Sequence, residues 1–241
     1  MSTPPLEELR PRLSGQLATG LTMRRLYATD ASEYQEMPLG VAFPKTEADV
    51  REIILFAARH RIGIIPRTAG TSLAGQVVGN GLVVDLSPHF NRIILIDKER
   101  RRARVQPGVV RNELNLELAK HGLVFGPETS TANRAMIGGM VGNNSCGSNS
   151  IVFGSTRDHL VSARGFFSDG SEATLGALGP EAFAEKCASG GAEGRVYRAA
   201  RELLWNGGNR RLIAENFPRA SIPRRNTGYA LDLLMDASAL D

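Results

Sequence analysis

The sequence predicts an α+β fold, because short apolar runs of strand length alternate with segments of helical periodicity. Residues 62–65 and 82–86 are β-branched or apolar runs that fit buried strands. Residues 46–60 place apolar side chains at helical spacing behind Thr46, which is a favourable N-cap residue. With 241 residues, 42% of them hydrophobic, the chain is long enough for one folded domain or two small lobes.

The N-terminal part carries weaker signals. Three prolines lie around residues 6–9, so we expect a loosely attached helix within residues 1 to 20. Residues 24–32 read R-R-L-Y-A-T-D-A-S, which on physical grounds alone fits a capped turn on the surface. Residues 41–44 are expected to form a short strand.

The helix over residues 46–60 is expected to bury one face and to end at a basic residue. Its apolar positions at helical spacing are Val50, Ile53, Ile54, Ala57 and Ala58. His60 falls where the negative end of the helix dipole favours a basic group. We therefore interpret His60 as an end-of-helix residue and not as a ligand.

A hairpin and a second helix follow. Residues 93–96 and 103–106 predict two paired strands, and the charged stretch between them is interpreted as a solvated turn. Residues 112–121 predict a helix with Gly122 at the C′ position.

A second hairpin and further helices are expected towards the C-terminus. Residues 161–167 predict a strand, and residues 168–171 a hairpin turn that leads to its partner. Residues 176–194, rich in Gly and Ala, predict a mobile excursion or a short helix. Residues 196–205 and 210–217 predict helices, with Trp205 as a packing residue.

The glycine-rich loop at residues 66–76 is the strongest candidate for ligand binding. Gly70 and Gly75 permit positive φ, and small neighbours let a ligand approach the backbone closely. Consecutive N–H groups in such a turn form an anion-binding nest. Further donors are the side chains of Arg67, Thr68, Thr71 and Ser72. An ordinary connection between two strands remains the alternative.

A second stretch of the same character covers residues 125–130 and 136–148. We interpret it as loop, because it has too many glycines for a helix interior and too many polar residues for a core strand. Two such loops in one domain can embrace a long ligand with a phosphate-rich middle and flat ends.

Together these stretches contain the motifs P-R-x-x-G-T-S-x-x-G-Q, P-E-T, I-G-G-M-x-x-N-N-S-C-G and F-G-S-T-R-D. The combination resembles the FAD-binding domain of the vanillyl-alcohol oxidase/p-cresol methylhydroxylase (PCMH) type. Within that type it is most similar to FAD-linked D-2-hydroxy-acid dehydrogenases, which oxidise D-lactate, glycolate or D-2-hydroxyglutarate. The resemblance covers about residues 26–234, including an N-T-G-Y element at 226–229. Residues 24–32 also resemble the family's entry segment, in which an R-x-x-Y-x-x-D-A-S run precedes the first lobe. It implies a two-lobed PCMH-type domain and not a Rossmann fold, since no G-x-G-x-x-G motif opens a helix.

The resemblance also implies domain boundaries. We expect an N-terminal extension over residues 1–35, one FAD-binding lobe over 36–108 and a second over 109–241, incomplete at its C-terminus. Related enzymes continue with a flavin-contacting strand and a cap domain. We therefore expect the chain to be an N-terminal fragment of a longer enzyme. We also expect weak or absent FAD in the purified chain, mobility in residues 176–194 and near the C-terminus, and no activity on its own.

Cofactor-binding residues follow from position in the matched motifs. The resemblance places the pyrophosphate at Arg67, Thr68, Ala69, Gly70, Thr71, Ser72 and Gln76. It places the flavin and the ribityl–pyrophosphate stretch at Pro127, Glu128, Thr129, Gly138, Gly139, Asn143, Asn144 and Gly147, and it places Gly154, Thr156 and Val161 near the FAD, partly towards the adenine. Non-covalent binding is expected, because Thr71 stands where covalent members commonly have His, and no Cys lies between residues 127 and 139.

The implied reaction is oxidation of a D-2-hydroxy acid, with hydride passing from Cα to flavin N5. The catalytic base is unknown from this sequence. His89 lies in a Ser-Pro turn, and His159 is interpreted as a buried structural histidine. The family's catalytic and carboxylate-binding residues are expected outside this chain.

Composition limits the other partners. Cys146 and Cys187 are far apart and form no metal-ligand pattern, so an iron–sulfur cluster is expected only in a missing downstream domain. The net charge of +4 suits an anionic cofactor and does not point to nucleic acid. No apolar run approaches the ~20 residues of a membrane span and no secretory signal opens the chain, so we expect a cytoplasmic protein, with peripheral membrane association left open.

Two other functions remain open. A non-catalytic nucleotide- or phosphate-binding module would use the first loop and would bind ADP as well as FAD. A different flavoenzyme on this domain type, such as a sugar-nucleotide reductase, is the second, although the N-N-S-C-G and N-T-G-Y elements favour the hydroxy-acid branch. The particular hydroxy acid, the electron acceptor and the oligomeric state are not specified by the sequence.

Overall fold

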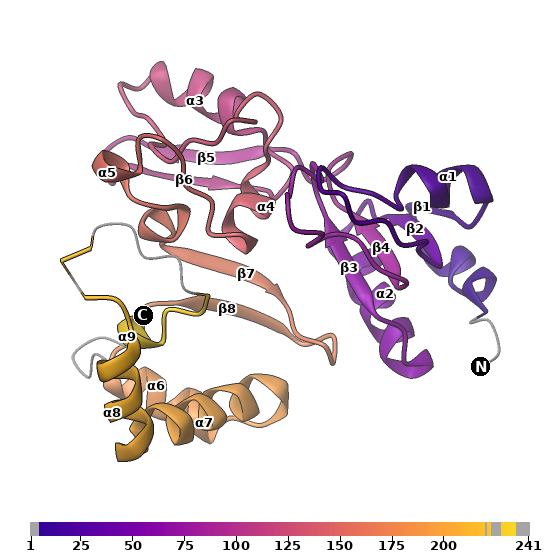
Figure 1. The fold of residues 1–241 in the computed structure, drawn as a ribbon. Helices are drawn as coiled ribbons and strands as arrows, with labels where there is room; N and C mark the ends of the chain where they lie inside the picture. Colours follow the sequence, from indigo (N-terminus) through magenta and orange to yellow (C-terminus); the bar gives the residue numbers. More distant parts are fainter. Residues whose placement is uncertain (1–4, 220, 223–227, 235–241) are drawn as a thin grey trace. The chain divides into compact units, whose positions relative to one another are not determined.

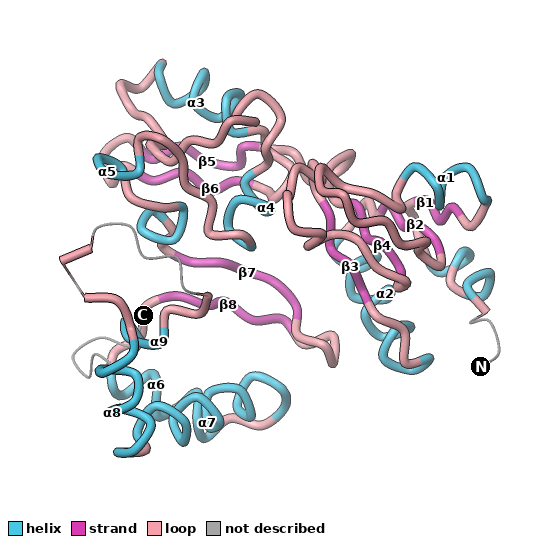
Figure 2. The backbone as a smooth tube through the Cα atoms, viewed as in Figure 1, coloured by secondary structure: helices cyan, strands magenta, loops and turns pink. Residues whose placement is uncertain are grey.

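The computed structural model describes residues 5–219, 221–222 and 228–234 (Figure 1). Helices and strands alternate with long loops, which confirms the predicted α+β fold (Figure 2). The chain divides into two compact units, residues 1–159 and residues 160–241. The boundaries expected for an N-terminal extension and two FAD-binding lobes stay a prediction. Asn226 and Thr227 of the N-T-G-Y element, and residues 235–241, lie outside the described residues.

The first unit contains a four-stranded sheet in the order β1-β2-β4-β3. Its strands are β1 (Gln16–Ala18), β2 (Gly40–Phe43), β3 (Ile64–Arg67) and β4 (Leu82–Asp85). β1 is antiparallel to β2, whereas β2, β4 and β3 are mutually parallel. The central β4 is buried along its whole length, which explains its three consecutive apolar residues.

Helix α2 (Glu47–His60) begins at a capping box, which confirms Thr46 as its N-cap residue. Thr46 Oγ1 accepts the N–H of Asp49 at 3.1 Å, and the Asp49 carboxylate accepts the N–H of Thr46 at 3.3 Å. The helix buries Phe56, which the prediction omitted, and exposes Ala58, which was expected to be buried. The buried stripe thus lies slightly further around the helix than apolarity alone indicates.

The hydrophobic core of this sheet packs β1, β2 and β4 against α2. His60 ends the helix and packs its ring against Phe56, with the ring centroids 4.3 Å apart, which confirms its interpretation as an end-of-helix residue. The buried cluster comprises Leu6, Leu9, Leu17, Ala42, Ile53, Phe56, Leu82 and Val84.

The N-terminal segment is part of this core, so the predicted loose helix is wrong. Two 3₁₀ turns, Leu6–Glu8 and Arg10–Arg12, replace it, and both Leu6 and Leu9 are buried. Proline interrupts regular helix here, but the apolar side chains still reach the core. Helix α1 (Leu21–Leu26) follows β1.

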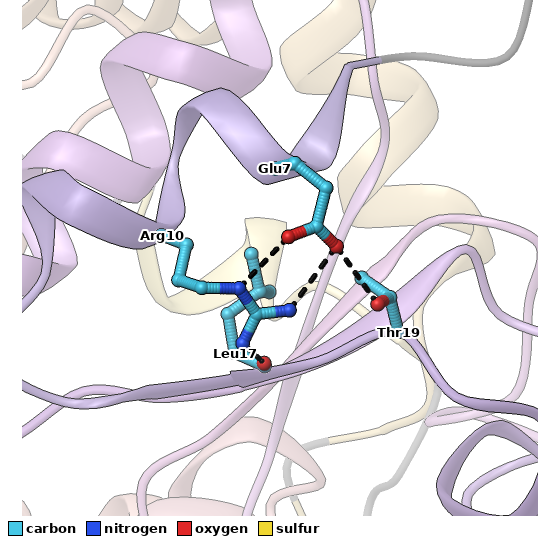
Figure 3. A network of polar contacts seen from close by, with 4 residues as sticks. All are labelled: Glu7, Arg10, Leu17 and Thr19. Carbon is cyan, nitrogen blue, oxygen red and sulfur yellow. Dashed lines mark hydrogen bonds and ion pairs between the residues drawn. The ribbon is translucent and has the colours of Figure 1, made fainter.

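Polar contacts attach the N-terminal turns to the region of β1 (Figure 3). Arg10 Nη1 donates to the carbonyl of Leu17 at 2.5 Å. The Glu7 carboxylate accepts hydrogen bonds from Arg10 and from the hydroxyl of Thr19, and these bonds hold the pKa of Glu7 below its usual value. The attachment therefore uses both apolar burial and a shared ion-pair network.

A second hydrophobic core lies in the same unit. The hairpin β5 (Ile93–Asp97) and β6 (Arg102–Val105) and helix α3 (Arg111–Ala119) confirm the elements predicted there. Gly122 has φ of 69°, the left-handed conformation expected at C′. The core is formed by Val109, Leu114 and Leu118, with Ile93, Ile96, Val105, Leu123, Phe125 and Ile137 packed against it.

The run I-G-G-M-V-G forms helix α4 (Ile137–Gly142), so the loop predicted over residues 136–148 is wrong for this part. Met140 is buried and anchors the helix. A Cβ on Gly138 would lie 3.0 Å from Cα of Pro107, so only glycine fits there without rearrangement. Close backbone packing has outweighed the low helix propensity of glycine.

The second unit begins with the predicted hairpin, formed by β7 (Ser162–Phe166) and β8 (Glu172–Gly176). Helix α6 (Pro180–Ala188) occupies much of residues 176–194, which agrees with the short-helix alternative for that stretch. The short helix α9 (Leu231–Leu234) is the last described element.

Two longer helices complete the second unit, close to the predicted ranges. They are α7 (Gly191–Trp205) and α8 (Gly207–Asn216). The ring of Phe183 stacks on Trp205 with a centroid separation of 5.6 Å and meets Tyr197 edge-on at 5.8 Å. Trp205 is therefore a packing residue, as predicted.

Candidate functional site

The first glycine-rich loop leaves the carboxyl end of β3, beside the carboxyl end of β4. Arg67 and Asp85 are register partners at these strand ends. Gly70 and Gly75 have φ of 65° and 69°, which confirms the conformation predicted for both. Ligands of parallel sheets commonly bind outside the carboxyl ends of the strands, so the loop starts at a favourable place.

Several backbone N–H groups of this loop have no acceptor in the part of the chain that the structure describes. None of the N–H groups of residues 69–74 donates a hydrogen bond there, although residues 69–72 are partly buried. An unmet buried donor costs about 1–3 kcal/mol, and consecutive donors of this kind suit an anion. The loop therefore fits a pyrophosphate group.

The structure brings the two glycine-rich segments together. Gln76 Nε2 donates to Asn143 Oδ1 at 2.6 Å. Thr68 lies against α4, because its Oγ1 is 2.9 Å from the position that a Cβ on Gly139 would occupy. Residues assigned independently on the two segments thus line one region of the first unit.

The guanidinium of Arg67 is already engaged by protein groups. Its Nη1 donates to the carbonyl of Thr29 at 2.8 Å, and its Cζ lies 5.0 Å from the ring centroid of Tyr27. A Cβ on Gly70 would lie 2.8 Å from this Cζ. The glycine therefore allows the guanidinium to lie directly against the loop backbone.

Tyr27 and Asp85 connect residues 24–32 to the end of β4. The Tyr27 hydroxyl donates to Asp85 Oδ2 at 2.6 Å, and Asp85 Oδ1 accepts the N–H of Ser87 at 2.8 Å. Burial, and then the hydrogen bond to Asp85, raise the pKa of Tyr27. The buried Asp85 carboxylate thus has donors for both oxygens, as a buried charge requires.

Asp30 connects the same segment to the middle of the first loop. Its Oδ2 accepts the hydroxyl of Ser72, and its Oδ1 accepts the N–H of Ser32 at 2.8 Å. Burial alone would raise the pKa of Asp30, but the hydrogen bonds from Ser32 and Ser72 outweigh it and lower this pKa. Residues 24–32 are therefore more than a surface turn, because they contact the candidate site.

The stretch at residues 125–129 is held by two polar side chains of α3. Arg111 Nε donates to the carbonyl of Pro127 at 3.1 Å. Asn115 exchanges two hydrogen bonds with the backbone of Phe125, at 2.8 Å and 3.1 Å. These contacts fix the backbone that carries the P-E-T motif.

The P-E-T motif contacts the segment that follows α4. Glu128 Oε2 accepts from Asn149 Nδ2 at 2.8 Å. A Cβ on Gly147 would overlap the carbonyl oxygen of Glu128 and lie 2.7 Å from its carbonyl carbon. Thr129 Oγ1 is 3.3 Å from Thr131 Oγ1. The structure thus brings Glu128 and Gly147 together.

The remaining assigned residues lie after these contacts. Asn144 has φ of 46°, and its Oδ1 accepts the N–H of Arg157 at 2.9 Å. Thr156 is buried, and its hydroxyl donates to the carbonyl of Ser145 at 2.7 Å. Gly154 has φ of 67°. All of these belong to the first unit, whereas Val161 belongs to the second, and its assignment stays a prediction.

His159 is exposed, so its interpretation as a buried histidine is wrong. It lies in a 3₁₀ turn (Thr156–His159) that follows α5 (Ser150–Phe153). Its Nε2 is 2.6 Å from the carbonyl of Phe153, and its ring meets Phe125 edge-on at 5.7 Å. These are structural contacts, and no catalytic role is assigned to it.

Five residues that contact the site were not predicted to do so. They are Tyr27, Asp30, Asp85, Arg111 and Asn115. Asp85 had a usable signal, because a carboxylate that directly follows an apolar strand is often buried with partners. The contacts of the other four join residues 10 to 58 positions apart, so local periodicity does not reveal them.

Within the described residues, no group of three or more His, Cys, Asp or Glu side chains is arranged to hold a metal ion. Over the same part of the chain, no helix combines the length and apolarity needed to cross a bilayer. Neither Cys146 nor Cys187 forms a disulfide in the described part of the chain.

Known proteins match large parts of this chain. A family model described as "FAD binding domain" matches residues 38–176. D-2-hydroxyglutarate dehydrogenase of Pseudomonas putida is 38% identical over 235 residues, which are 96% of this chain and 23% of that protein. Glycolate oxidase subunit GlcD of Bacillus subtilis is 36% identical over 141 residues, 57% of this chain and 30% of that protein. The chain therefore spans about a quarter of the length of these relatives.

Solved structures share the fold at lower identity. An alkyldihydroxyacetonephosphate synthase matches with a TM-score of 0.63 and 20% identity, covering 70% of this chain and 34% of its own. p-Cresol methylhydroxylase matches with a TM-score of 0.61 and 17% identity, covering 71% of this chain and 34% of its own. The family match, the geometry of the two glycine-rich segments and this fold lead to one conclusion: the chain belongs to the FAD-binding domain family and has the fold of the PCMH-type flavoenzymes.

Proposed function

We propose that this chain is the FAD-binding part of an oxidoreductase that oxidises a D-2-hydroxy acid. The observation that carries the proposal is the first loop, whose partly buried N–H groups lack acceptors among the described residues and lie beside the second glycine-rich segment. Relatives named for D-2-hydroxyglutarate and glycolate support the substrate class. The N–H groups of the first loop support an anionic cofactor without reference to the relatives.

The roles of the residues follow from their positions. In this proposal the N–H groups of residues 69–72 donate to the pyrophosphate, and Thr71 adds a hydroxyl donor. Gly138, Gly139 and Gly147 let Pro107, Thr68 and Glu128 pack closely against the second segment, and in this proposal the packed segment lies along the flavin. Because Thr71 is a weak nucleophile and no cysteine precedes α4 in the second segment, we propose that FAD is held non-covalently.

The chemistry divides between cofactor and protein. When bound, FAD supplies the acceptor, at flavin N5, for the hydride from Cα of the hydroxy acid. This chain's own residues bind and orient the cofactor and exclude water from the pyrophosphate. Because the described histidines make structural contacts or lie outside the two segments, we assign the base to none of them, and we expect no turnover by this chain alone.

FAD titration tests the proposal directly. Purified chain is titrated with FAD, ADP and riboflavin, and binding is followed by flavin fluorescence or by displacement. We expect saturable FAD binding that is tighter than binding of either fragment molecule, because FAD uses both segments. Absence of FAD binding would refute the proposal, and equal affinity for ADP would instead favour a nucleotide-binding module.

The same sample tests the linkage and the reaction. After acid denaturation the yellow colour is expected in the supernatant, and colour retained by the polypeptide would show covalent attachment. D-2-hydroxyglutarate and D-lactate are then assayed with an artificial electron acceptor. Turnover by the 241-residue chain would contradict the assignment of the base to residues outside it.

A further inference from the structure

The segment from Tyr27 to Tyr34 lies outside the assigned cofactor residues and contacts the first loop at several positions along it. The carbonyl oxygen of Thr29 accepts a hydrogen bond from the guanidinium of Arg67, at the start of the loop. Asp30 accepts the hydroxyl of Ser72, in its middle. These contacts link positions that are 38 and 42 residues apart, so they are tertiary contacts and not part of a local turn.

The end of the loop is held by the same segment. A Cβ on Gly75 would lie 2.9 Å from Cδ2 of Tyr34, so the tyrosine ring lies directly against the loop backbone. The segment from Tyr27 to Tyr34 therefore contacts the loop at its start, middle and end. The N–H groups between these points are the ones that lack acceptors in the described part of the chain.

We infer that Asp30 is a positioning residue that holds the first loop in its anion-binding conformation before the cofactor arrives. This inference rests on the proposed function. A carboxylate facing a pyrophosphate would repel it, so Asp30 acts through Ser72 and not by contact with the ligand. A loop ordered in advance loses less entropy when the ligand binds, which strengthens binding without a new ligand contact.

The contact with Asp30 changes the role that is expected for Ser72. Its hydroxyl hydrogen is donated to Asp30 Oδ2, so this hydrogen is not available to a phosphate oxygen. Ser72 then serves the ligand through its backbone N–H, which has no acceptor in the described chain. The hydroxyl donors left for the ligand in this loop are those of Thr68 and Thr71.

The chain contains a matched control for Asp30. Asp169 makes the same local turn, because its Oδ1 accepts both the N–H and the hydroxyl of Ser171, two positions later. Its Oδ2 likewise accepts from a distant residue, the N–H of Ala192 at 3.1 Å. Asp169 belongs to the second unit and is bonded to none of the assigned residues of the first loop.

The experiment compares Asp30→Ala with Asp169→Ala in the 241-residue chain. For each variant we measure the FAD dissociation constant, the melting temperature and the rate of tryptic cleavage after Arg67 without ligand. Losing a hydrogen bond to a charged group is expected to raise the FAD dissociation constant about tenfold in Asp30→Ala. Asp169→Ala is expected to leave it within about twofold, as for a distant independent site. Cleavage after Arg67 is expected to increase only in Asp30→Ala.

Two results would overturn the inference. One is an unchanged FAD dissociation constant and cleavage rate in Asp30→Ala. The other is a rise in the FAD dissociation constant and cleavage rate that is in proportion to the fall in melting temperature and is the same in both variants. Asp30 would then be a general structural residue. If Asp30→Ala does not fold, Ser72→Ala removes the same hydrogen bond and is judged by the same measurements. If the parent chain binds no FAD, the proposed function fails, and the cleavage rate still decides whether Asp30 holds the loop.

Discussion

The two glycine-rich segments of the first unit use glycine for different physical reasons. In the first loop, Gly70 and Gly75 have positive φ, which turns consecutive N–H groups away from acceptors in the described chain. In the second segment, Gly138 and Gly147 have ordinary φ, and a Cβ on either would collide with neighbouring atoms. One set of glycines shapes a binding surface, whereas the other permits close packing of the backbone.

Glycine content alone therefore does not identify a ligand-binding loop. Substitutions in the packing set are expected to lower stability first and binding only as a consequence. Substitutions in the first loop are expected to lower binding more than stability. The comparison can therefore be tested one glycine at a time.

The largest effect is expected for Gly147→Ala. The new Cβ would overlap the backbone carbonyl of Glu128, which cannot move aside as a flexible side chain can. We expect the free energy of unfolding to fall by about 3 kcal/mol or more, at the upper end for overpacking. Chemical denaturation measures this loss. A fall of less than about 0.5 kcal/mol, the scale of a neutral surface change, would show that this glycine is not required for packing.

An intermediate effect on stability is expected for Gly70→Val, together with a marked loss of binding. A β-branched residue at φ of 65° costs about 1–2 kcal/mol, and its Cβ would displace the guanidinium of Arg67. The FAD dissociation constant is expected to rise at least about tenfold, because the loop backbone must change shape. Circular dichroism checks that the variant folds. A folded variant with parental FAD affinity would remove the first loop from the site.

The smallest effect is expected for Gly142→Ala, which also serves as the control for Gly147→Ala. Gly142 is the last residue of α4 and is exposed. Apart from its chain neighbours and the backbone of its own helix, no described atom lies within 4 Å of the position that an added Cβ would occupy. Alanine is expected to stabilise the protein by about 0.5–1 kcal/mol through its helix propensity and the lower entropy of the unfolded chain. Thermal unfolding and FAD titration should show a small gain in stability and unchanged affinity. A loss of stability would show that the glycines of α4 share one packing role.

Local sequence patterns predicted most of the fold. The N-cap at Thr46, the charged turn between β5 and β6 and the apolar run of β4 each specify their own element within a few residues. The failures came where tertiary packing overrode local preference. The glycine-rich α4 is helical because its backbone packs against Pro107, and the N-terminal turns are ordered because Leu6 and Leu9 reach the core.

The residues of the candidate site that belong to the motifs could be predicted from the sequence. The contacts that hold those residues in place could not. Gly70 and Gly75 could be predicted to have positive φ from their positions in a short polar loop. The contact of Ser72 with Asp30 joins residues 42 positions apart, and the sequence contains no periodicity that pairs them. Supporting contacts of this kind depend on the register and packing of the finished sheet.

The hydrogen bond between Gln76 and Asn143 has a consequence for synthesis of the protein. It joins positions 67 residues apart, whereas the four-stranded sheet needs the chain only as far as Asp85. At about 5–20 residues per second, the ribosome takes roughly 3–12 s to extend the chain from the end of this sheet to Asn143. We expect a nascent chain to form the sheet first and to capture its cofactor only after that delay. Stalled nascent chains of increasing length, assayed for flavin binding, would contradict this order if chains ending before Asn143 already bound FAD.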